Sequence, residues 1–266
     1  MNDRVRVEVS DGVADVRLTR GDKHNGLDRR MFEAIIDTGT KLAGDRSLRA
    51  VVLSGEGPSF CAGLDFASFM REGADFEALL APRDDSPANF VQQAAWVWAE
   101  LPVPVIAALH GYVFGGGLQM ALAADLRYVA ADAALSVREI EWGLVPDMSG
   151  TQTLRHLVRL DVAKELTFTG RKVSGEEAVA LGLATRVEAD PHAAARRVAA
   201  EIAQRSPDAI RAGKRLLNQA FTGSTDEGLR LEEQVQRTVL GRPHQLEAVA
   251  AGMSKRAPRF VDPAEG

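Results

Sequence analysis

The sequence predicts an α/β protein in which a sheet and its covering helices are followed by a purely helical region. Short apolar runs alternate with helical segments up to about Val187, and the strand signals stop after Asp190. Such alternation is typical of a layered sheet covered by helices. Two segments also lead from a strand through a glycine turn into a helix, as expected where a sheet edge carries a site.

The N-terminal elements are a hairpin and a helix. Residues 5–9 ("VRVEV") and 13–19 ("VADVRLT") alternate in polarity and flank the turn signal "SDG", which predicts a β-hairpin. The next apolar residues recur at helical spacing, and Asp28 precedes them as a capping residue: Met31, Ile35, Ile36 and Leu42.

Four further strands are expected along the middle of the chain. Residues 49–55 ("RAVVLSG") form a buried strand and turn, and residues 102–111 ("PVPVIAALHG") form another with both prolines at its start. Residues 126–130 ("LRYVA") and 134–137 ("ALSV") are shorter strands. Three helices are predicted at 191–204, 207–221 and 225–240, and a fourth follows Pro243. We therefore predict a core at residues 1–190 and a helical region at 191–266.

Composition limits the classes of function. The 266 residues carry a net charge of −5, which makes a general nucleic-acid surface improbable. Cys61 is the single cysteine, so no internal disulfide forms, and the five histidines lack ligand-like spacing, so no metal site is expected. The N-terminus does not resemble a targeting signal and no apolar run spans a membrane. The sequence predicts a reduced, soluble, cytoplasmic protein without membrane contacts.

Two loops share one design. Residues 54–66 ("SGEGPSFCAGLDF") leave the strand at 51–53 and reach a helix near Leu64. Residues 110–119 ("HGYVFGGGLQ") leave the strand at 105–109 and reach a helix at Gly117. Unpaired N–H groups at helix starts favour negative charge, although one such loop is often only a tight turn. Two together could place two donors around one developing oxyanion.

Other uses of the glycines fit less well. A dinucleotide-binding fingerprint starting at Gly115 requires a small residue where Met120 stands, and a P-loop starting at Gly111 requires lysine where Gly117 stands. A G-x-S-x-G nucleophile elbow is absent from the sequence. Cys61 lies among apolar residues without a neighbouring histidine, so we do not predict a nucleophilic role for it.

Motifs along nearly the whole chain resemble the crotonase superfamily, the enoyl-CoA hydratase/isomerase fold. Gly21 stands where the family usually has proline. The matching segments are "VRLTRGDKHNGLD" (16–28), "SFCAGLDF" (59–66), "HGYVFGGGLQMALAADLRYVA" (110–130), "LSVREIEWGLVPDMSGTQTL" (135–154) and "SKRAPRF" (254–260). The resemblance implies a crotonase-like (ClpP/crotonase) spiral of β-β-α units with a C-terminal helical trimerisation region. It also implies a role in fatty acid metabolism and β-oxidation.

The resemblance implies which groups hold the substrate. The backbone N–H groups of Leu64 and Gly116 would form the oxyanion hole for a thioester carbonyl. A side chain at residues 115–117 would then obstruct the oxygen, which accounts for three consecutive glycines. The positions that would contact coenzyme A, as part of the substrate and not as a separate cofactor, are Lys23, Ala62, Gly63, Leu64, Asp65 and Gly116, with Lys255, Arg256 or Arg259 as further phosphate partners.

The acid–base groups depart from the hydratase pattern. Family hydratases carry two glutamates, whereas this chain has Gln119 at the first position and Glu139 at the second. An amide cannot accept or deliver a proton at neutral pH, although it can orient water or substrate. Asp147 matches an aspartate of the related dienoyl-CoA isomerases, so Glu139 and Asp147 together slightly favour isomerisation. Glu141 is expected to be an ordinary polar neighbour and Trp142 to pack in the core.

Three functions stay open at this point. The leading hypothesis is hydration or double-bond migration of an unsaturated acyl-CoA through an enolate. A catalytically reduced acyl-CoA-binding protein is the second, supported by Gln119, and another crotonase reaction such as carbon–carbon bond cleavage is the third. The C-terminal helices, with Leu229, Leu231, Val235 and Leu240, resemble the family's trimerisation region and imply a homotrimer or a dimer of trimers.

Overall fold

The computed structural model describes residues 3–72, 75–84, 86–220 and 223–263. Within them, one sheet has six strands in the order β1-β2-β3-β4-β6-β9 and a smaller sheet has three in the order β5-β7-β8. The larger sheet contains β1 (Val5–Ser10), β2 (Val13–Leu18), β3 (Ala50–Gly55), β4 (Val105–Leu109), β6 (Leu126–Val129) and β9 (Arg186–Val187). The smaller sheet contains β5 (Tyr112–Phe114), β7 (Ala134–Ser136) and β8 (Val173–Ser174).

The strand pairing confirms the predicted hairpin and shows a spiral. β1 and β2 are antiparallel, with Val7 opposite Val16, and β2, β3, β4, β6 and β9 run parallel. From β4 onward the chain alternates between the sheets: β4 and β6 belong to the larger, and β5 and β7 to the smaller. β8 and β9 were not predicted, because two-residue strands are too short to show a period.

Helices cover both faces of the larger sheet. On β3, Val51 and Leu53 belong to the cluster that packs under α1 (Arg29–Gly44) and α4 (Phe90–Glu100). Val52, on the opposite face, packs with Ala195 and Ala199 of α9 (Pro191–Ala203). These side chains are fully buried. A parallel strand buried on both faces is apolar throughout, which is why residues 50–53 show no alternation.

The predicted start of α1 is confirmed. The Asp28 carboxylate accepts a hydrogen bond from the backbone N–H of Met31 at 2.8 Å, which satisfies a donor in the first turn. The remaining elements of the core are η1 (Gly21–Lys23), α2 (Phe66–Glu72), α3 (Phe76–Leu80), α5 (Gly116–Leu122), η2 (Glu139–Trp142), α6 (Gly150–Leu157), α7 (Leu160–Thr169) and α8 (Gly175–Leu181).

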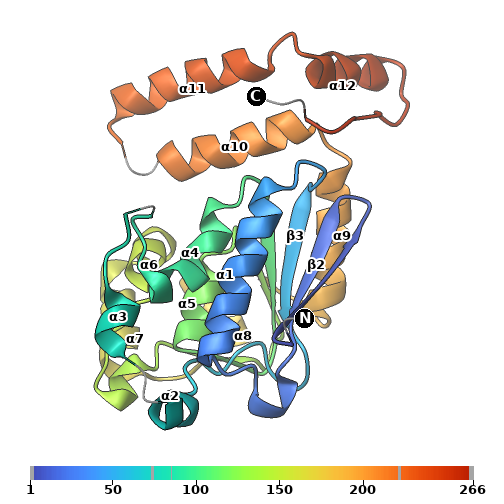
Figure 1. Cartoon of the computed structure of the whole chain (residues 1–266). Coiled ribbons are helices and arrows are strands. Elements are labelled where there is room, and N and C mark those ends of the chain that lie inside the picture. Colours follow the sequence, from blue (N-terminus) through green and yellow to red (C-terminus); the bar gives the residue numbers. More distant parts are fainter. Residues whose placement is uncertain (1–2, 73–74, 85, 221–222, 264–266) are drawn as a thin grey trace.

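The four predicted C-terminal helices are α9, α10 (Pro207–Ala220), α11 (Thr225–Val239) and α12 (Pro243–Met253). Figure 1 shows α10, α11 and α12 as a separate layer beyond one end of the sheet, with the C-terminus among them. α9 instead packs on the sheet itself. We therefore propose that the core includes α9 and that the appended helical region begins with α10.

The described ranges contain neither a membrane-spanning helix nor a metal-binding cluster of side chains. No helix there is long and apolar enough to cross a membrane. No group of three or more His, Cys, Asp or Glu side chains in the same residues is placed to hold a metal ion.

Candidate active site

A backbone bridge ties the loop before α1 to the loop after β3. The N–H of Leu27 donates to the carbonyl of Gly63 at 2.8 Å, and the N–H of Asp65 donates to the carbonyl of Leu27 at 3.0 Å. In this parallel pattern the residue between the two partners, Leu64, points its own N–H away from Leu27. No described residue accepts a backbone hydrogen bond from that N–H. The Leu64 amide is therefore a donor aimed away from the bridge.

A second bridge brings the two glycine loops together. Cys61 pairs in parallel with Val113 of β5, directly before the glycine run. Gly63 has a φ of +89°, and a Cβ there would lie 2.8 Å from a carbonyl oxygen of the β5 strand and 3.6 Å from the Gly116 nitrogen. Gly116 is the first residue of α5, whose N–H has no partner within the helix. The Cys61–Val113 bridge thus places the loop that carries Leu64 beside the segment that leads to Gly116.

Each glycine of the run has its own reason to be there. Gly115 has a φ of +51°, a conformation that side chains rarely allow. A Cβ on Gly116 would lie 2.5 Å from the Met148 sulfur, and one on Gly117 would lie 2.4 Å from the Cys61 carbonyl oxygen. Gly115 is therefore favoured by its backbone conformation and Gly117 by packing against backbone, whereas the Met148 side chain near Gly116 can move. These reasons for Gly115 and Gly117 differ from the clearance for substrate that the sequence predicted.

Gln119 lies in the first turns of α5 and is buried, with 2% of its surface exposed. Its side-chain oxygen accepts hydrogen bonds from the backbone N–H groups of Met148 at 2.8 Å and Gly150 at 3.0 Å. Its side-chain nitrogen donates to Oε1 of Glu139 at 2.5 Å. The structure thus brings Gln119 and Glu139 together as the motifs predicted. The sequence did not predict that the Met148 and Gly150 amides would hold the Gln119 oxygen.

Glu139 begins η2 and is 8% exposed. Its Oε2 atom is buried and has no hydrogen-bond partner among the described residues. Burial is the main cause that raises the pKa of Glu139, and the negative charge of Asp147 adds to it. Hydrogen bonds from the backbone at Glu139, from Gln119 and from the backbone at Arg138 oppose the rise. A buried carboxyl with a free oxygen and a raised pKa is suited to accept and return a proton near neutral pH.

Asp147 lies close enough to act on Glu139. Its side chain contacts solvent, yet the surrounding protein still desolvates it enough to raise the pKa of Asp147. Glu141 points elsewhere, because its carboxylate pairs with Arg138 at 2.6 Å, as expected of an ordinary polar neighbour. The segment from η2 to Asp147 therefore carries two carboxyls with raised pKa: Glu139, which is buried, and Asp147, which contacts solvent.

The expectation that Trp142 packs in the core is wrong. The Trp142 side chain is 59% exposed, and its ring lies 4.6 Å from that of Phe66 in α2, centroid to centroid. Leu144 and Val145 in the same segment are also exposed. A glycine at 143 with a φ of +69° ends η2 and turns this segment outward. The chain segment between Glu139 and Asp147 therefore exposes apolar side chains.

The positions predicted to contact coenzyme A lie on two connected loops. Lys23 is exposed at the end of η1, and the N–H of Ala62 donates to the carbonyl of His24 in the same loop at 2.9 Å. The Asp65 carboxylate caps α2 and pairs with Arg20 at 2.7 Å, so this side chain holds the loops together. Arg20 was missed, because nothing in the sequence shows that it reaches a carboxylate so far along the chain.

The basic tail residues are not brought to this site. Asp262 pairs with Arg49 at 2.5 Å, just before β3 begins, whereas the loop carrying Leu64 leaves the other end of that strand. Arg256 is paired with Glu247 of α12 at 2.6 Å. Figure 1 shows the C-terminus at the α10–α12 end and α2 at the opposite end. The structure therefore does not bring these tail residues to the Leu64 loop of the same chain, and their contact with coenzyme A phosphates stays a prediction.

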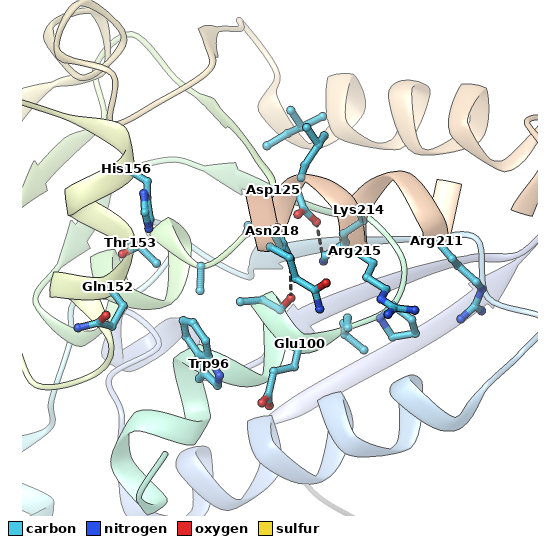
Figure 2. Close-up of a pocket in the computed structure, with 18 of the residues that line it drawn as sticks. Trp96, Glu100, Asp125, Gln152, Thr153, His156, Arg211, Lys214, Arg215 and Asn218 are labelled. Carbon is cyan, nitrogen blue, oxygen red and sulfur yellow. Dashed lines mark hydrogen bonds and ion pairs between the residues drawn. The ribbon is translucent and has the colours of Figure 1, made fainter. Parts of the chain in front are cut away.

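A cavity of about 1350 Å³ lies under α10, apart from these carboxyls (Figure 2). Trp96 of α4 and Gln152 of α6 line it from the core, and Lys214 of α10 reaches across to Asp125 at 2.7 Å. Asp125 also accepts from the N–H of Val105, as expected of a structural partner. The lining includes neither the glycine loops nor the two acids, so size alone does not identify the reactive centre.

Comparisons with known proteins agree over nearly the full length. A family model described as Enoyl-CoA hydratase/isomerase matches residues 8–263. The chain is similar to the mitochondrial enoyl-CoA hydratase domain-containing protein 2 of Bos taurus, with 34% identity over 260 residues covering 94% of this chain and 84% of that protein. It is also similar to the mitochondrial Delta(3,5)-Delta(2,4)-dienoyl-CoA isomerase of Mus musculus, with 32% identity over 263 residues covering 94% and 79%.

Solved structures show the same similarity in three dimensions. The crystal structure of an enoyl-CoA hydratase from Bacillus anthracis matches with a TM-score of 0.88 at 30% identity, covering 97% of this chain and 98% of that one. An enoyl-CoA hydratase from Streptomyces coelicolor matches with a TM-score of 0.87 at 31% identity, covering 97% and 94%.

Proposed function

The chain belongs to the enoyl-CoA hydratase/isomerase family of the crotonase superfamily and has its fold, and from this we propose that it moves a double bond in an unsaturated acyl-CoA. The fold predicted from the motifs is thereby confirmed. Relatives named as hydratases and as a dienoyl-CoA isomerase match it about equally well, so the choice of reaction depends on this chain's own acids.

The observation that carries the proposal is the contact between Gln119 and Glu139. An amide transfers no proton, and both ends of this one are already bonded within the protein. The remaining acid near Glu139 is Asp147, which acts on it electrostatically. One buried carboxyl and a nearby second one support proton transfer between carbons better than the two-glutamate activation of water.

The reaction would then run through an enolate. The Glu139 carboxylate removes a proton from the acyl chain, and the electrons of the broken C–H bond move into the thioester carbonyl. The Leu64 and Gly116 N–H groups, which have no backbone acceptor within the described residues, would hold the resulting oxyanion. Returning the proton to another carbon restores the carbonyl and leaves the double bond in its new place. Asp147 is the second group available for that delivery.

A catalytically inactive binding protein is the weaker alternative. Burying a carboxyl whose Oε2 has no partner costs stability, and such costs concentrate where a group does chemistry. The predicted contacts of Lys23, Ala62, Gly63 and Asp65 with coenzyme A would serve either function. The cytoplasmic location also stays a prediction, because the bovine and mouse relatives are named as mitochondrial.

Two substrates distinguish the reactions. The protein is incubated with a 2-enoyl-CoA and with a 3,5-dienoyl-CoA while the conjugated chromophores are followed. Migration predicts turnover of the dienoyl thioester, and Glu139→Gln lowers it by about 10²–10⁴-fold. Glu141→Gln, a neighbouring change outside the site, leaves it unaltered. Rapid hydration of the first substrate without action on the second contradicts isomerisation, and an unaffected Glu139→Gln removes that residue as the base.

We also propose that the chain assembles as a trimer or a dimer of trimers through α10–α12. Leu229 on α11 and Leu240 directly after it are 60% and 61% exposed, whereas Val235 is buried within the chain. Leu246 of α12 is 56% exposed. Light scattering tests the assembly: Leu240→Glu should lower the measured mass, whereas Gln234→Lys, at an exposed position on a different face of α11 from Leu229, should leave it unchanged. A monomeric mass for the unaltered chain contradicts the proposal.

A further inference from the structure

The Gln119 side chain is held in one orientation. Two backbone N–H groups, those of Met148 and Gly150, point at its oxygen. Rotating the amide by half a turn would place an N–H group against these two donors and leave all of them unsatisfied. The nitrogen of Gln119 must therefore face Glu139, where it donates to Oε1.

We propose that Gln119 is a positioning residue that confines the exchangeable proton of Glu139 to a single oxygen, Oε2. Oε1 already accepts the Gln119 N–H, so a proton on Oε1 would face a donor that has no alternative partner. The backbone of Gly115 also lies against that oxygen, since a Cβ there would be 3.5 Å from Oε1. Oε2 is the oxygen without a partner among the described residues.

This assignment differs from a role for Gln119 in orienting water or substrate. Both of its polar atoms are engaged with the protein, and 2% of its surface is exposed. The charge of Asp147 opposes ionisation of Glu139, whereas the hydrogen bonds from Gln119 and from the backbone at Glu139 and Arg138 favour the ionised form. Gln119 thus selects the oxygen, and Asp147 and burial adjust how readily that oxygen holds the proton.

The catalytic consequence rests on the proposed function. If Oε2 alone removes the proton, the same oxygen holds that proton while the enolate exists, and it can return the proton to a second carbon. A substrate deuterated at the carbon that loses the proton should then retain part of its label in the product. Delivery by Asp147 would instead take a proton from solvent and lose the label.

The first test needs no substrate. Protein labelled with ¹³C at the glutamate carboxyl carbons is titrated by NMR, and the Glu139 signal is assigned from its disappearance in Glu139→Gln. Gln119→Met keeps the side-chain length but cannot donate, so the pKa of Glu139 should rise. Gln119→Glu keeps an acceptor for the Met148 and Gly150 amides, which protects folding. Its new carboxyl should make the pair titrate in two coupled steps.

Gln93 provides a matched control, because this buried glutamine also donates to a glutamate, Glu100, at 3.0 Å. Gln93→Met should leave the Glu139 titration unchanged. An unchanged Glu139 titration in both Gln119 variants would overturn the proposal, whatever reaction the protein catalyses.

The second test measures turnover. Because Gln119 is 2% exposed and its side-chain oxygen and nitrogen both hydrogen-bond within the protein, Gln119→Met should lower kcat by about 10–100-fold with KM changed by less than about twofold. Complete loss of the deuterium label from the unaltered protein would overturn transfer through one oxygen. If no thioester is turned over at all, the proposed function fails, and the NMR titration still decides whether the Gln119 hydrogen bond acts on the Glu139 carboxyl.

Discussion

A single methyl group at Gly117 tests how the two glycine loops are held together. In Gly117→Ala the new Cβ would lie 2.4 Å from the carbonyl oxygen and 2.7 Å from the Cβ of Cys61. Real Cβ atoms essentially never approach closer than 3.0 Å, so the loop carrying Cys61 must move by at least about 0.6 Å. The obstructing atoms are backbone and a short buried side chain, so rotation of a flexible side chain cannot relieve the contact.

The cost follows from overpacking a dense interior. Such insertions typically destabilise by about 1–3 kcal/mol. For a chain of this size that corresponds to a lowering of Tm by roughly 3–10 °C. The loss in kcat should be larger than the loss of folding free energy alone explains. Leu64 lies three residues after Cys61 in the same loop, so a shift of Cys61 also moves the proposed donor at Leu64. A displacement approaching 1 Å between the two proposed donors costs up to about 10²-fold in kcat.

Circular dichroism during heating measures the change in Tm, and steady-state kinetics on the substrate that the protein turns over measures the change in kcat. Gly213→Ala on α10 is the control, because a Cβ there meets nothing within 4 Å. That change should leave Tm equal or raise it slightly, since alanine favours helix over glycine by about 1 kcal/mol. A Gly117→Ala protein with unchanged Tm and kcat would refute the reasoning.

Three further outcomes follow from buried polar groups. Lys214→Met leaves the Asp125 carboxylate without its 2.7 Å partner and should lower the free energy of unfolding by about 2–4 kcal/mol in urea titrations; no change would show that the pair contributes nothing. Burial would raise the pKa of Asp15, but hydrogen bonds, including that from His192, hold it well below its usual value. The resulting stability is present above pH ~4 and is lost as pH falls through the folded-state pKa, so Asp15→Asn should flatten the acid limb of a stability profile, and an unaltered limb would contradict this. Burial raises the pKa of the Cys61 thiol to about 12, so a thiol reagent should label it only on unfolding; labelling of the folded protein would show that the loop opens.

Elements with a clear period or a cap were predictable from the sequence. The hairpin of β1 and β2, the helix that begins after Asp28 and the four C-terminal helices all depend on local patterns. The motifs also singled out Gln119 and Glu139, and the structure joins these two side chains by a hydrogen bond. Trp142 was placed in the core because a large aromatic residue usually packs inside, whereas here the turn at Gly143 leaves it 59% exposed.

Contacts between segments that are distant in the sequence could not be predicted from local patterns. The Met148 and Gly150 amides fix Gln119 from 29 and 31 residues away, and no local pattern shows that an amide oxygen meets them. The need for Gly117 likewise arises from atoms of another segment, so a glycine run in sequence cannot tell close packing from clearance for a ligand. The roles of Leu64 and Gly116 stay predictions until a thioester is tested.

The bridges formed by Leu27 and by Cys61 use main-chain atoms alone. These backbone contacts therefore do not require a particular side chain at residues 119, 139 or 147. Residues 119, 139 and 147 could be exchanged in combination, and a library of acids, amides and alcohols at these sites would sample different chemistries on an unchanged frame.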